Sequence, residues 1–234
     1  MRSFTLQNFV TLATDPVYGT IALRTLGIAA LVTVTDATIA FPIAYYMARV
    51  AGGRTRALLL MAVLLPLWSS YLVRVYAWRA ILSPGGLFDW AFGLVGLPNL
   101  SPGFSDVSMW IVFSYLWLPY MILPIFAGLE RIPNSLISAS EDLGAAPFTT
   151  FRRVILPLAF PAVVAGSIFT FSLTLGDYIT PKYIGNSQFL GNVIYDSQGV
   201  AGNIPFAAAF AVVPVVIMAI YLLAARRLGA FDAL

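Results

Sequence analysis

The stretch Ser138-Ala139-Ser140-Glu141-Asp142-Leu143-Gly144, with Val154-Ile155-Leu156-Pro157 beginning ten residues after its glycine, is the most informative part of this 234-residue chain. It is short and polar, and strongly apolar runs lie on both sides of it. A polar insert between apolar runs favours a segment that leaves the apolar layer and meets something in water. The stretch therefore predicts a surface that another protein can grip.

The residues around this stretch predict where a first short helix begins and ends. Pro133 suits the first turn of a helix, because its missing N–H has no partner there anyway. Ser138 and Glu141 have the Ser-x-x-Glu spacing of a capping box. Gly144 can take the left-handed conformation that ends a helix. We expect the first helix to stop at this glycine.

A second short helix is predicted directly afterwards. Pro147 can open it, and Pro157 is expected to stop it, since proline breaks the hydrogen-bond ladder of a helix. The two helices would meet at a tight corner of small residues, Leu143-Gly144-Ala145-Ala146, which lets another chain approach closely. The alternative is an amphipathic loop that merely lies on a membrane surface.

Composition identifies the chain as an integral membrane protein. It is 60% hydrophobic and only 10% charged, with a mean hydropathy of +0.88, whereas soluble domains average about a quarter charged residues. Cysteine and histidine are both absent, which excludes disulfides, thiolate metal sites and the commonest general base. We expect neither a catalytic residue nor a metal site.

Five runs are long enough to cross a bilayer. They cover about 21–48, 57–82, 107–129, 161–180 and 205–225, and the polar insert occupies the link 130–160. Arginines concentrate in the links 49–56 and 130–160 and in the C-terminal tail, and the alternate links 83–106 and 181–204 hold a single lysine. The positive-inside rule then predicts an outside N-terminus and a cytoplasmic C-terminus. A single domain is expected, with a short helix between Leu87 and Leu97 on the outer side.

The polar insert resembles the EAA loop of inner-membrane subunits of ATP-binding cassette (ABC) importers. That motif begins with small residues, continues to a glycine and closes with an I-x-L-P ending. The matching positions are Ala139, Ser140, Gly144, Val154, Leu156 and Pro157. The motif's leading glutamate is Ser138 here, although Glu141 and Asp142 keep the surface acidic.

Further stretches are similar to the spermidine/putrescine permease branch of this family, over nearly the whole chain. They are Phe41-Pro42-Ile43-Ala44-Tyr45, Leu65-Pro66-Leu67-Trp68, Val73-Arg74-Val75-Tyr76-Ala77-Trp78 and Leu175-Gly176-Asp177-Tyr178-Ile179-Thr180-Pro181. The resemblance implies an all-α transmembrane fold of the type I ABC importer permease class. Because members of this branch usually have six spans, we expect a first span to precede the five visible ones.

The resemblance also implies how the chain works. In this family the loop forms a coupling helix that sits in a groove of an ATPase subunit, so residues 133–156 would couple the spans to ATP hydrolysis elsewhere. The implied coupling residues are Ser138, Ala139, Ser140, Glu141, Asp142, Gly144, Ala145, Val154, Leu156 and Pro157. The chain has no Gly-x-x-x-x-Gly-Lys-Ser/Thr sequence, which agrees with a permease that is not an enzyme.

The implied complex lies in the bacterial inner membrane, in contact with lipid. The expected partners are a homologous second permease, in a heterodimer, two ATPase subunits and an extracytoplasmic substrate-binding protein, with no nucleic acid. ATP and magnesium would be bound by the ATPase subunits, and this chain would bind no cofactor. The substrate would be a polyamine or a related amino compound, moved by alternating access.

Charged residues within the predicted spans are candidates for the substrate path, because each costs about 2.5–3.5 kcal/mol to insert. Asp36 would attract a cationic amine, or it would be a structural partner of Arg74 or a protonated carboxyl. Asp177 lies where Gly176 and Pro181 indicate a broken helix, and broken helices often line cavities. It would contact the substrate or cap neighbouring amides at a helix end.

Aromatic residues near Arg74 are the other candidates for this path. They are Trp68, Tyr71, Tyr76 and Trp78, and Tyr178 follows Asp177. Aromatic faces attract protonated amines, and they equally suit the interfacial belt of a membrane protein. Arg74 repels a polyamine, so it would be an ion-pair or gate residue, or a ligand if the substrate carries a carboxylate or phosphonate.

Several alternatives stay open from the sequence. One is an ion-coupled secondary transporter in which Asp36 and Asp177 bind a proton or sodium ion. Another is an ABC importer for an anionic or zwitterionic substrate such as an aminophosphonate or opine. An intramembrane enzyme lacks any paired catalytic motif, and a membrane scaffold would leave Asp36 and the acidic loop unexplained.

Overall fold

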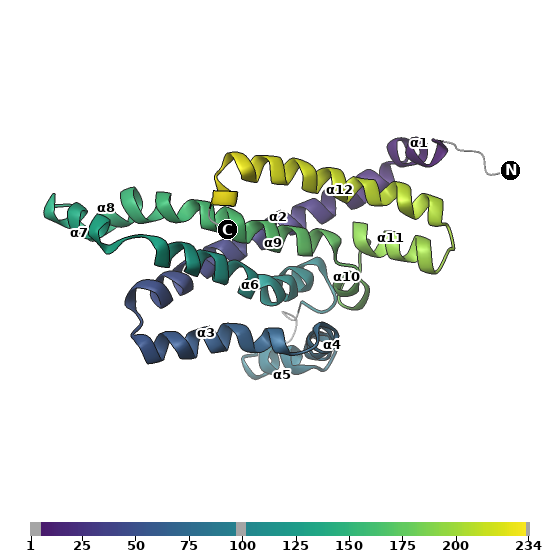
Figure 1. Ribbon diagram of the computed structural model, residues 1–234. Helices are drawn as coiled ribbons and strands as arrows, with labels where there is room; N and C mark the ends of the chain where they lie inside the picture. The colour runs from purple at the N-terminus through teal and green to yellow at the C-terminus, as the bar shows by residue number, and fades with distance from the viewer. Residues whose placement is uncertain (1–5, 97–101, 233–234) are drawn as a thin grey trace. The chain divides into compact units, whose positions relative to one another are not determined.

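A computed structural model of the chain describes residues 6–96 and 102–232, and throughout these ranges every regular element is helical (Figure 1). The helices are α1 (Gln7–Thr14), α2 (Pro16–Tyr45), α3 (Gly53–Trp68), α4 (Tyr71–Leu82), α5 (Leu87–Leu94), α6 (Asp106–Arg131), α7 (Asn134–Asp142), α8 (Pro147–Thr150), α9 (Leu156–Gly176), α10 (Ile179–Tyr183), α11 (Leu190–Gly199) and α12 (Ile204–Arg227). The all-α prediction is confirmed.

The chain divides into two compact units. Unit 1 combines residues 1–32, 70–116 and 171–219, and unit 2 combines 33–69, 117–170 and 220–234. The long helices α2, α6, α9 and α12 each supply residues to both units. The single-domain assignment stays a prediction.

Four helical stretches are long and apolar enough to cross a membrane by length and composition. They are Pro16–Val50, Asp106–Arg131, Pro147–Gly176 and Ile204–Arg227. The stretches Gly53–Trp68 and Tyr71–Leu94 meet the same test only as a pair, which makes up to five spans. The upper number equals the five spans predicted, whereas the predicted span 161–180 differs from the observed helix, which ends at Gly176.

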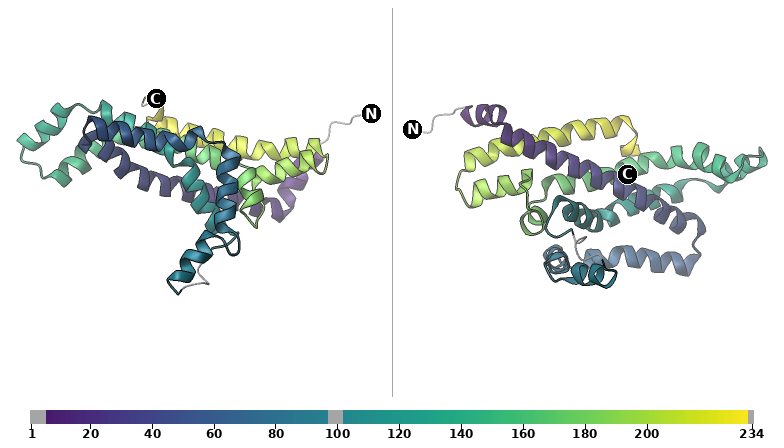
Figure 2. Two further views of the ribbon diagram at one scale, coloured as in Figure 1. Left: turned by 90° about the horizontal axis from the view of Figure 1, so that it is seen from below. Right: turned by 180° about the vertical axis from the view of Figure 1, so that it is seen from behind.

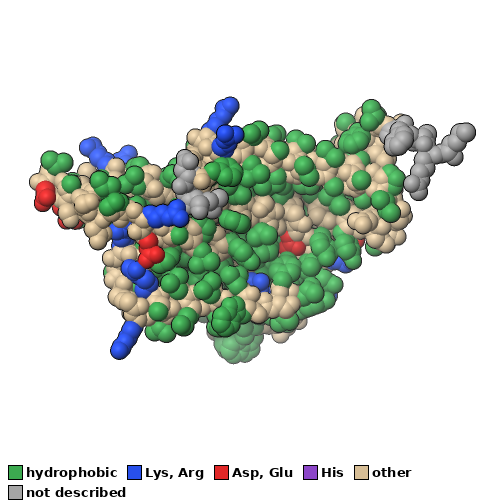
Figure 3. Space-filling model, viewed as in Figure 1, with side chains coloured by type: hydrophobic (Ala, Val, Ile, Leu, Met, Phe, Trp, Pro, Cys, Tyr) green, Lys and Arg blue, Asp and Glu red, His purple; other side chains and the backbone are tan. Residues whose placement is uncertain are grey.

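Large apolar side chains on these helices face outward. Leu65, Val215 and Leu223 expose 63–66% of their surface, and hydrophobic side chains cover much of the face shown in Figure 3. Such surfaces suit lipid, where backbone polar groups must be satisfied within the helix itself. The exposed apolar residues therefore agree with a multi-pass membrane protein.

The predicted span 57–82 is not one continuous helix. It breaks at Ser69 and Ser70, whose backbones are extended (ψ 148° and 136°). The hydroxyl of Ser69 donates instead to the carbonyl of Pro66, at 2.7 Å. The short helix predicted from Leu87 is found as α5, which ends at Leu94; Leu97 lies outside the described residues, and the outer position of this helix stays a prediction.

Unit 2 is held by close packing of α2, α6 and α9. Its core includes Ala44 of α2, Met47 of the turn that follows α2, Ile125 of α6 and Ala159 of α9. Glycine permits the closest approach, because a Cβ on Gly128 would lie 2.3 Å from the Cβ of Ala162. Small residues let helices in membranes pack backbone to backbone.

Unit 1 contains the shorter helices α4, α5, α10 and α11, which pack against one another and against α2. The hydroxyl of Thr25 on α2 accepts a hydrogen bond at 3.1 Å from the N–H of Leu190, the first residue of α11. Thr25 and Leu190 are both buried. α4 packs against both α5 and α10. These contacts place the helix break at Asp177 beside α4.

Candidate functional site

The polar insert forms a hook, here called the polar hook (residues 133–156), which projects beyond α6 and α9 in every view (Figures 1 and 2). α7 ends at Asp142, and Gly144 takes the left-handed conformation with φ +79°. The N–H of Gly144 donates to the carbonyl of Glu141 at 2.8 Å, and that of Ala145 to Ser140 at 3.1 Å. The predicted glycine corner is confirmed.

Two details of the predicted hook are wrong. Ser138 and Glu141 form no capping box, because α7 already begins at Asn134 and Ser138 lies within it. Pro157 does not stop the second helix, since α8 continues through a π-helical turn, Phe151–Ile155, into α9. Local π adjustments of this kind accommodate proline within membrane helices.

The tip of the polar hook exposes large apolar side chains. Leu143 is 89% exposed and Phe148 is 71% exposed, beside the exposed acids Glu141 and Asp142. A hollow of about 530 Å³ lies between α7 and the segment that follows the corner. It is lined by Leu136, Ala139, Ser140, Leu143, Gly144, Ala145, Thr149, Arg153 and Val154. Exposed apolar groups beside a hollow mark an interaction surface.

One side-chain bond braces the polar hook internally. The hydroxyl groups of Ser140 on α7 and Thr150 on α8 lie 3.0 Å apart in a hydrogen bond, and Thr150 is buried. Among the predicted coupling residues, Val154 lies in the π-helical turn and Leu156 and Pro157 open α9. The sequence prediction missed Ile155, which is the buried anchor of this turn in the unit 2 core.

The Asp177 cluster (Tyr71, Asp177 and Thr180) forms in unit 1 where α9 ends. Asp177 Oδ1 accepts hydrogen bonds from the backbone N–H groups of Ile179 and Thr180, at 2.8 and 3.4 Å. Oδ2 accepts from the hydroxyl of Thr180 at 2.7 Å and from that of Tyr71. The carboxylate thus caps neighbouring amides, which is the second of the two roles considered for it. The sequence prediction missed Thr180, whose hydroxyl reaches back three residues to Asp177.

The predicted aromatic residues of unit 1 are brought into ring contacts. The rings of Tyr178 and Tyr195 stack at 4.5 Å, those of Tyr76 and Tyr183 lie 5.0 Å apart, and Trp78 lies 5.4 Å from Tyr115. Two of these rings already make cation–π contacts with basic side chains of the same chain. Lys182 lies 4.7 Å from the centre of the Tyr195 ring and Arg79 lies 5.6 Å from that of Tyr183.

The remaining candidates divide between the two units. Asp36 is fully buried on the part of α2 in unit 2, and Trp68 is 86% exposed at the end of α3. Arg74 is buried in unit 1. Its Nε and Nη1 have no hydrogen-bond partner within the described ranges. The pair between Asp36 and Arg74 considered from the sequence stays a prediction.

The sequence prediction also missed two arginines that interact with the base of the polar hook. Arg49 and Arg56 served only to assign the orientation of the spans, but both make hydrogen bonds to helix ends. A signal was available, because Arg49 follows an apolar run directly and cations are favoured at helix C-termini. In the part of the chain that the structure describes, no cluster of acids could hold a metal ion.

Comparisons with known proteins agree with this architecture. Residues 40–231 match the family described as binding-protein-dependent transport system inner membrane component. The chain is 49% identical to the inner membrane ABC transporter permease protein YdcU of Escherichia coli K12, over 94% of the chain and 75% of that protein. It is 31% identical to the spermidine/putrescine transport system permease protein PotB of Haemophilus influenzae, over 92% and 76%.

Solved structures show the same fold at low sequence identity. A bacterial ABC transporter involved in the import of the acidic polysaccharide alginate gives a TM-score of 0.77 at 18% identity, over 97% of this chain and 85% of that one. The MetNI methionine ABC transporter gives 0.72 at 16% identity, over 95% and 98%. At these identities the likeness concerns the fold alone.

Proposed function

Since the chain belongs to the binding-protein-dependent transport system inner membrane components, the permease subunits of ABC importers, we propose that it carries polyamines across the inner membrane. The family assigns ATP hydrolysis to a separate subunit, so this chain is a multi-pass permease and not an enzyme. Membership of this family excludes the alternative of an ion-coupled secondary transporter.

The polar hook is the proposed coupling surface. The observation that supports it most is the exposure of Leu143 and Phe148 on either side of the Gly144 corner. Apolar anchors surrounded by polar groups are the usual composition of a binding hot spot. An ATPase subunit would receive this corner in a groove, with Gly144 allowing close approach.

The hook is joined to the spans in a way that suits transmission of movement. α8 continues through the π-helical turn into α9, and only Ile132 and Pro133 separate α6 from α7. A displacement of the hook would therefore move two spans together. Alternate opening of a central path to the two sides of the membrane would follow when the ATPase subunits bind and hydrolyse ATP.

The proposed complex contains two permeases, two ATPase subunits and an extracytoplasmic binding protein. The alginate transporter was solved in complex with a periplasmic protein carrying an alginate pentasaccharide, which supports a similar partner here.

The proposed orientation puts the polar hook and the C-terminus in the cytoplasm. Because the chain lacks cysteine, introduced cysteines test it. Ser135→Cys should react with a charged maleimide only after permeabilisation, and Gln188→Cys should react in intact cells.

Polyamines are the proposed substrates for two reasons. The first is the similarity, at about 30% identity, to several spermidine/putrescine permeases of the PotB type. The second is Asp36, a buried carboxyl on a membrane-crossing helix, which would offer a counter-charge to an ammonium group. We assign Asp177 a supporting role instead, because its oxygens already accept four hydrogen bonds.

One observation favours a second substrate class. Arg74 is buried with two guanidinium nitrogens that lack hydrogen-bond partners among the described residues. Buried charges are normally paired, and a guanidinium suits a carboxylate or phosphonate. A zwitterionic substrate such as an aminophosphonate or opine would supply that group.

The deciding experiment measures ATP hydrolysis by the reconstituted complex with its binding protein. The panel contains spermidine, putrescine, an aminophosphonate and an opine. Stimulation by the amines that Asp36→Asn reduces, while the complex still assembles, is expected. Stimulation by a zwitterion alone, lost in Arg74→Gln, would replace the polyamine proposal by the second one. A complex in which no ATPase subunit assembles would overturn the coupling proposal as well.

A further inference from the structure

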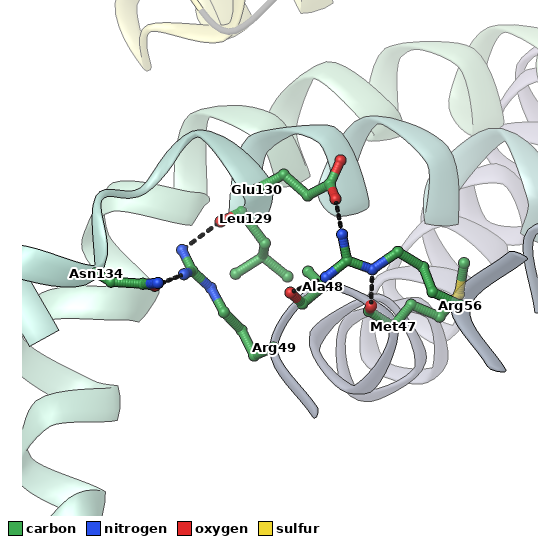
Figure 4. A network of polar contacts seen from close by, with 7 residues as sticks. All are labelled: Met47, Ala48, Arg49, Arg56, Leu129, Glu130 and Asn134. Atoms are coloured by element: carbon green, nitrogen blue, oxygen red, sulfur yellow. Dashed lines mark hydrogen bonds and ion pairs between the residues drawn. The ribbon is translucent and has the colours of Figure 1, made fainter. Parts of the chain in front are cut away.

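Arg49 binds the base of the polar hook from a different helix (Figure 4). It lies in the π-helical turn Tyr46–Val50 that follows α2. Its Nη2 donates to the carbonyls of Leu129 and Ile132, at 2.5 and 2.7 Å, and its Nη1 donates to Oδ1 of Asn134 at 2.7 Å. These acceptors span the joint (residues 129–134), where α6 ends and α7 begins.

The chemistry of this contact depends on the guanidinium group. The last carbonyls of a helix have no partner within it, and they form the negative end of its dipole. A guanidinium has five donors in a rigid planar fork, so one side chain can satisfy several acceptors at once. A lysine ammonium at Arg49 would keep the charge without this fixed geometry.

Arg56, from the first turn of α3, completes the arrangement. It donates to the carbonyls of Met47 and Ala48, at 3.1 and 3.0 Å. Its Nη1 also bonds Oε1 of Glu130 at 2.6 Å, as an ion pair. Arg56 thus caps the turn that contains Arg49, and its ion pair with Glu130 links this turn to α6. The end of α2, the start of α3 and the joint form one closed polar ring.

Apolar contacts lie beneath the ring but cannot replace it. Met47 and Leu129 belong to the same buried core. Burial of apolar surface stabilises without specifying direction, whereas hydrogen bonds fix the positions of donor and acceptor. The core keeps α2 and α6 together, and the ring sets their rotation and register at the joint.

We propose that Arg49 is a positioning residue that locks the joint to α2, so that movement of the polar hook reaches this helix as well as α6 and α9. α2 carries Asp36, which lies roughly 20 Å along the helix from Arg49. The lock would therefore connect the ATPase-facing hook to the proposed ammonium site. This inference rests on the proposed coupling function and names one residue that coupling requires.

The first test measures substrate transported per ATP hydrolysed by the whole complex in proteoliposomes. Arg49→Gln is expected to lower this ratio about fivefold or more, the smallest usual coupling effect, while the ATPase subunits still co-purify. The matched control is Arg54→Gln, at an exposed arginine on the first turn of α3, which should keep the wild-type ratio. An unchanged ratio in Arg49→Gln would overturn the proposal.

Arg49→Lys separates geometry from charge. Because a single ammonium cannot reproduce the fork, we expect this variant to stay uncoupled. A wild-type ratio in Arg49→Lys would mean that charge alone suffices, which contradicts a positioning role. If Gly144→Asp also leaves the ratio unchanged, the coupling function itself fails, whereas an effect of Gly144→Asp alone removes only Arg49 from the mechanism.

A distance measurement adds a readout that a loss of stability would not imitate. The chain has no cysteine, so spin labels at Ile39→Cys on α2 and Ser135→Cys on α7 are the only labels in this subunit when cysteine-free partners are used. In the otherwise native complex we expect one narrow distribution of distances between the two labels, and we expect it to be the same with and without ATP. Arg49→Gln should broaden it and make it depend on nucleotide. A narrow, unchanged distribution would contradict the lock.

Discussion

The polar hook and the Asp177 cluster are the two polar regions at the ends of the long helix α9, and they treat their functional groups in opposite ways. In the cluster, the carboxylate of Asp177 accepts bonds from two backbone N–H groups and two hydroxyls. In the hook, Leu143 and Phe148 point outward, and a hydrogen bond between the hydroxyls of Ser140 and Thr150 joins α7 to α8. One region satisfies its polar groups internally, and the other leaves large apolar side chains exposed.

This difference assigns different roles to residues that looked equivalent in the sequence. A buried polar group whose bonds are all made within the chain keeps a shape, and removing one partner leaves the others unsatisfied. An exposed apolar side chain adds little to the stability of its own fold. It stabilises a complex when another protein surface covers it and removes it from water. Substitutions in the cluster should therefore lower stability, and substitutions in the hook should lower binding.

The largest expected effect is that of Asp177→Ala. It leaves two hydroxyls and two N–H groups without an acceptor, and we expect a loss of roughly 2–4 kcal/mol in the free energy of unfolding. Thermal unfolding of the purified complex in detergent measures it. Asp196→Ala is the matched control, because the Asp196–Lys182 ion pair is half exposed and 4.0 Å long. The control should cost less than about 1 kcal/mol. A stable Asp177→Ala complex that has lost transport would instead make Asp177 a substrate ligand.

The second prediction concerns Gly144→Asp in the hook. We expect the complex to keep its melting temperature within a few degrees, because an aspartate in the left-handed region costs about 1–2 kcal/mol, and to lose transport about tenfold or more. Gly202→Asp is the control, since Gly202 has a similar φ of +63° and open space around it. Equal losses of transport in both variants would show that backbone strain, not the hook surface, is responsible.

Local sequence signals predicted those parts of the hook that depend on backbone chemistry. Gly144 closes α7, and Pro147 opens α8, because these residue types favour those positions in any protein. Pro157 misled the prediction, since in a membrane helix the preceding π-helical turn accommodates a proline that would end a helix in water. The solvent of each segment decides how the same residue acts.

Contacts between distant segments could not be predicted in the same way. Arg49 meets residues about 80 positions away and Tyr71 meets Asp177 more than 100 positions away. Charge counting used Arg49 correctly for orientation but said nothing about which helix end it would reach. The aromatic residues around Arg74 likewise suggested that Tyr71 contacts a cation, whereas its hydroxyl donates to the carboxylate of Asp177. Such pairings need the packing of the helices.

A smaller effect is expected for Leu143→Ala at the tip of the hook. Truncation of a central interface residue typically costs more than 1 kcal/mol, so the affinity of the permease for the ATPase subunit should fall by about tenfold. Binding of the purified ATPase subunit to the permease in nanodiscs measures it. Leu94→Ala, at a leucine of α5 that is 70% exposed, should leave the affinity unchanged. Unaltered binding of Leu143→Ala would move the contact away from the tip.

The smallest expected effect tests whether the hook has any internal rigidity of its own. Ser140→Ala removes the bond to Thr150, and a single neutral hydrogen bond is worth about 0.5–1.5 kcal/mol. The loss in the free energy of unfolding should lie near the lower end of this range, because the hydroxyl of Thr150 can rotate toward a nearby backbone carbonyl. Hydrogen exchange of the amides of α7 and α8 should become a few-fold faster, and Ser135→Ala, at an exposed serine of α7, should leave it unchanged. If Ser140→Ala destabilised the complex as much as Asp177→Ala, the hook would be held by its own bonds like the cluster, and its dependence on a partner would be refuted.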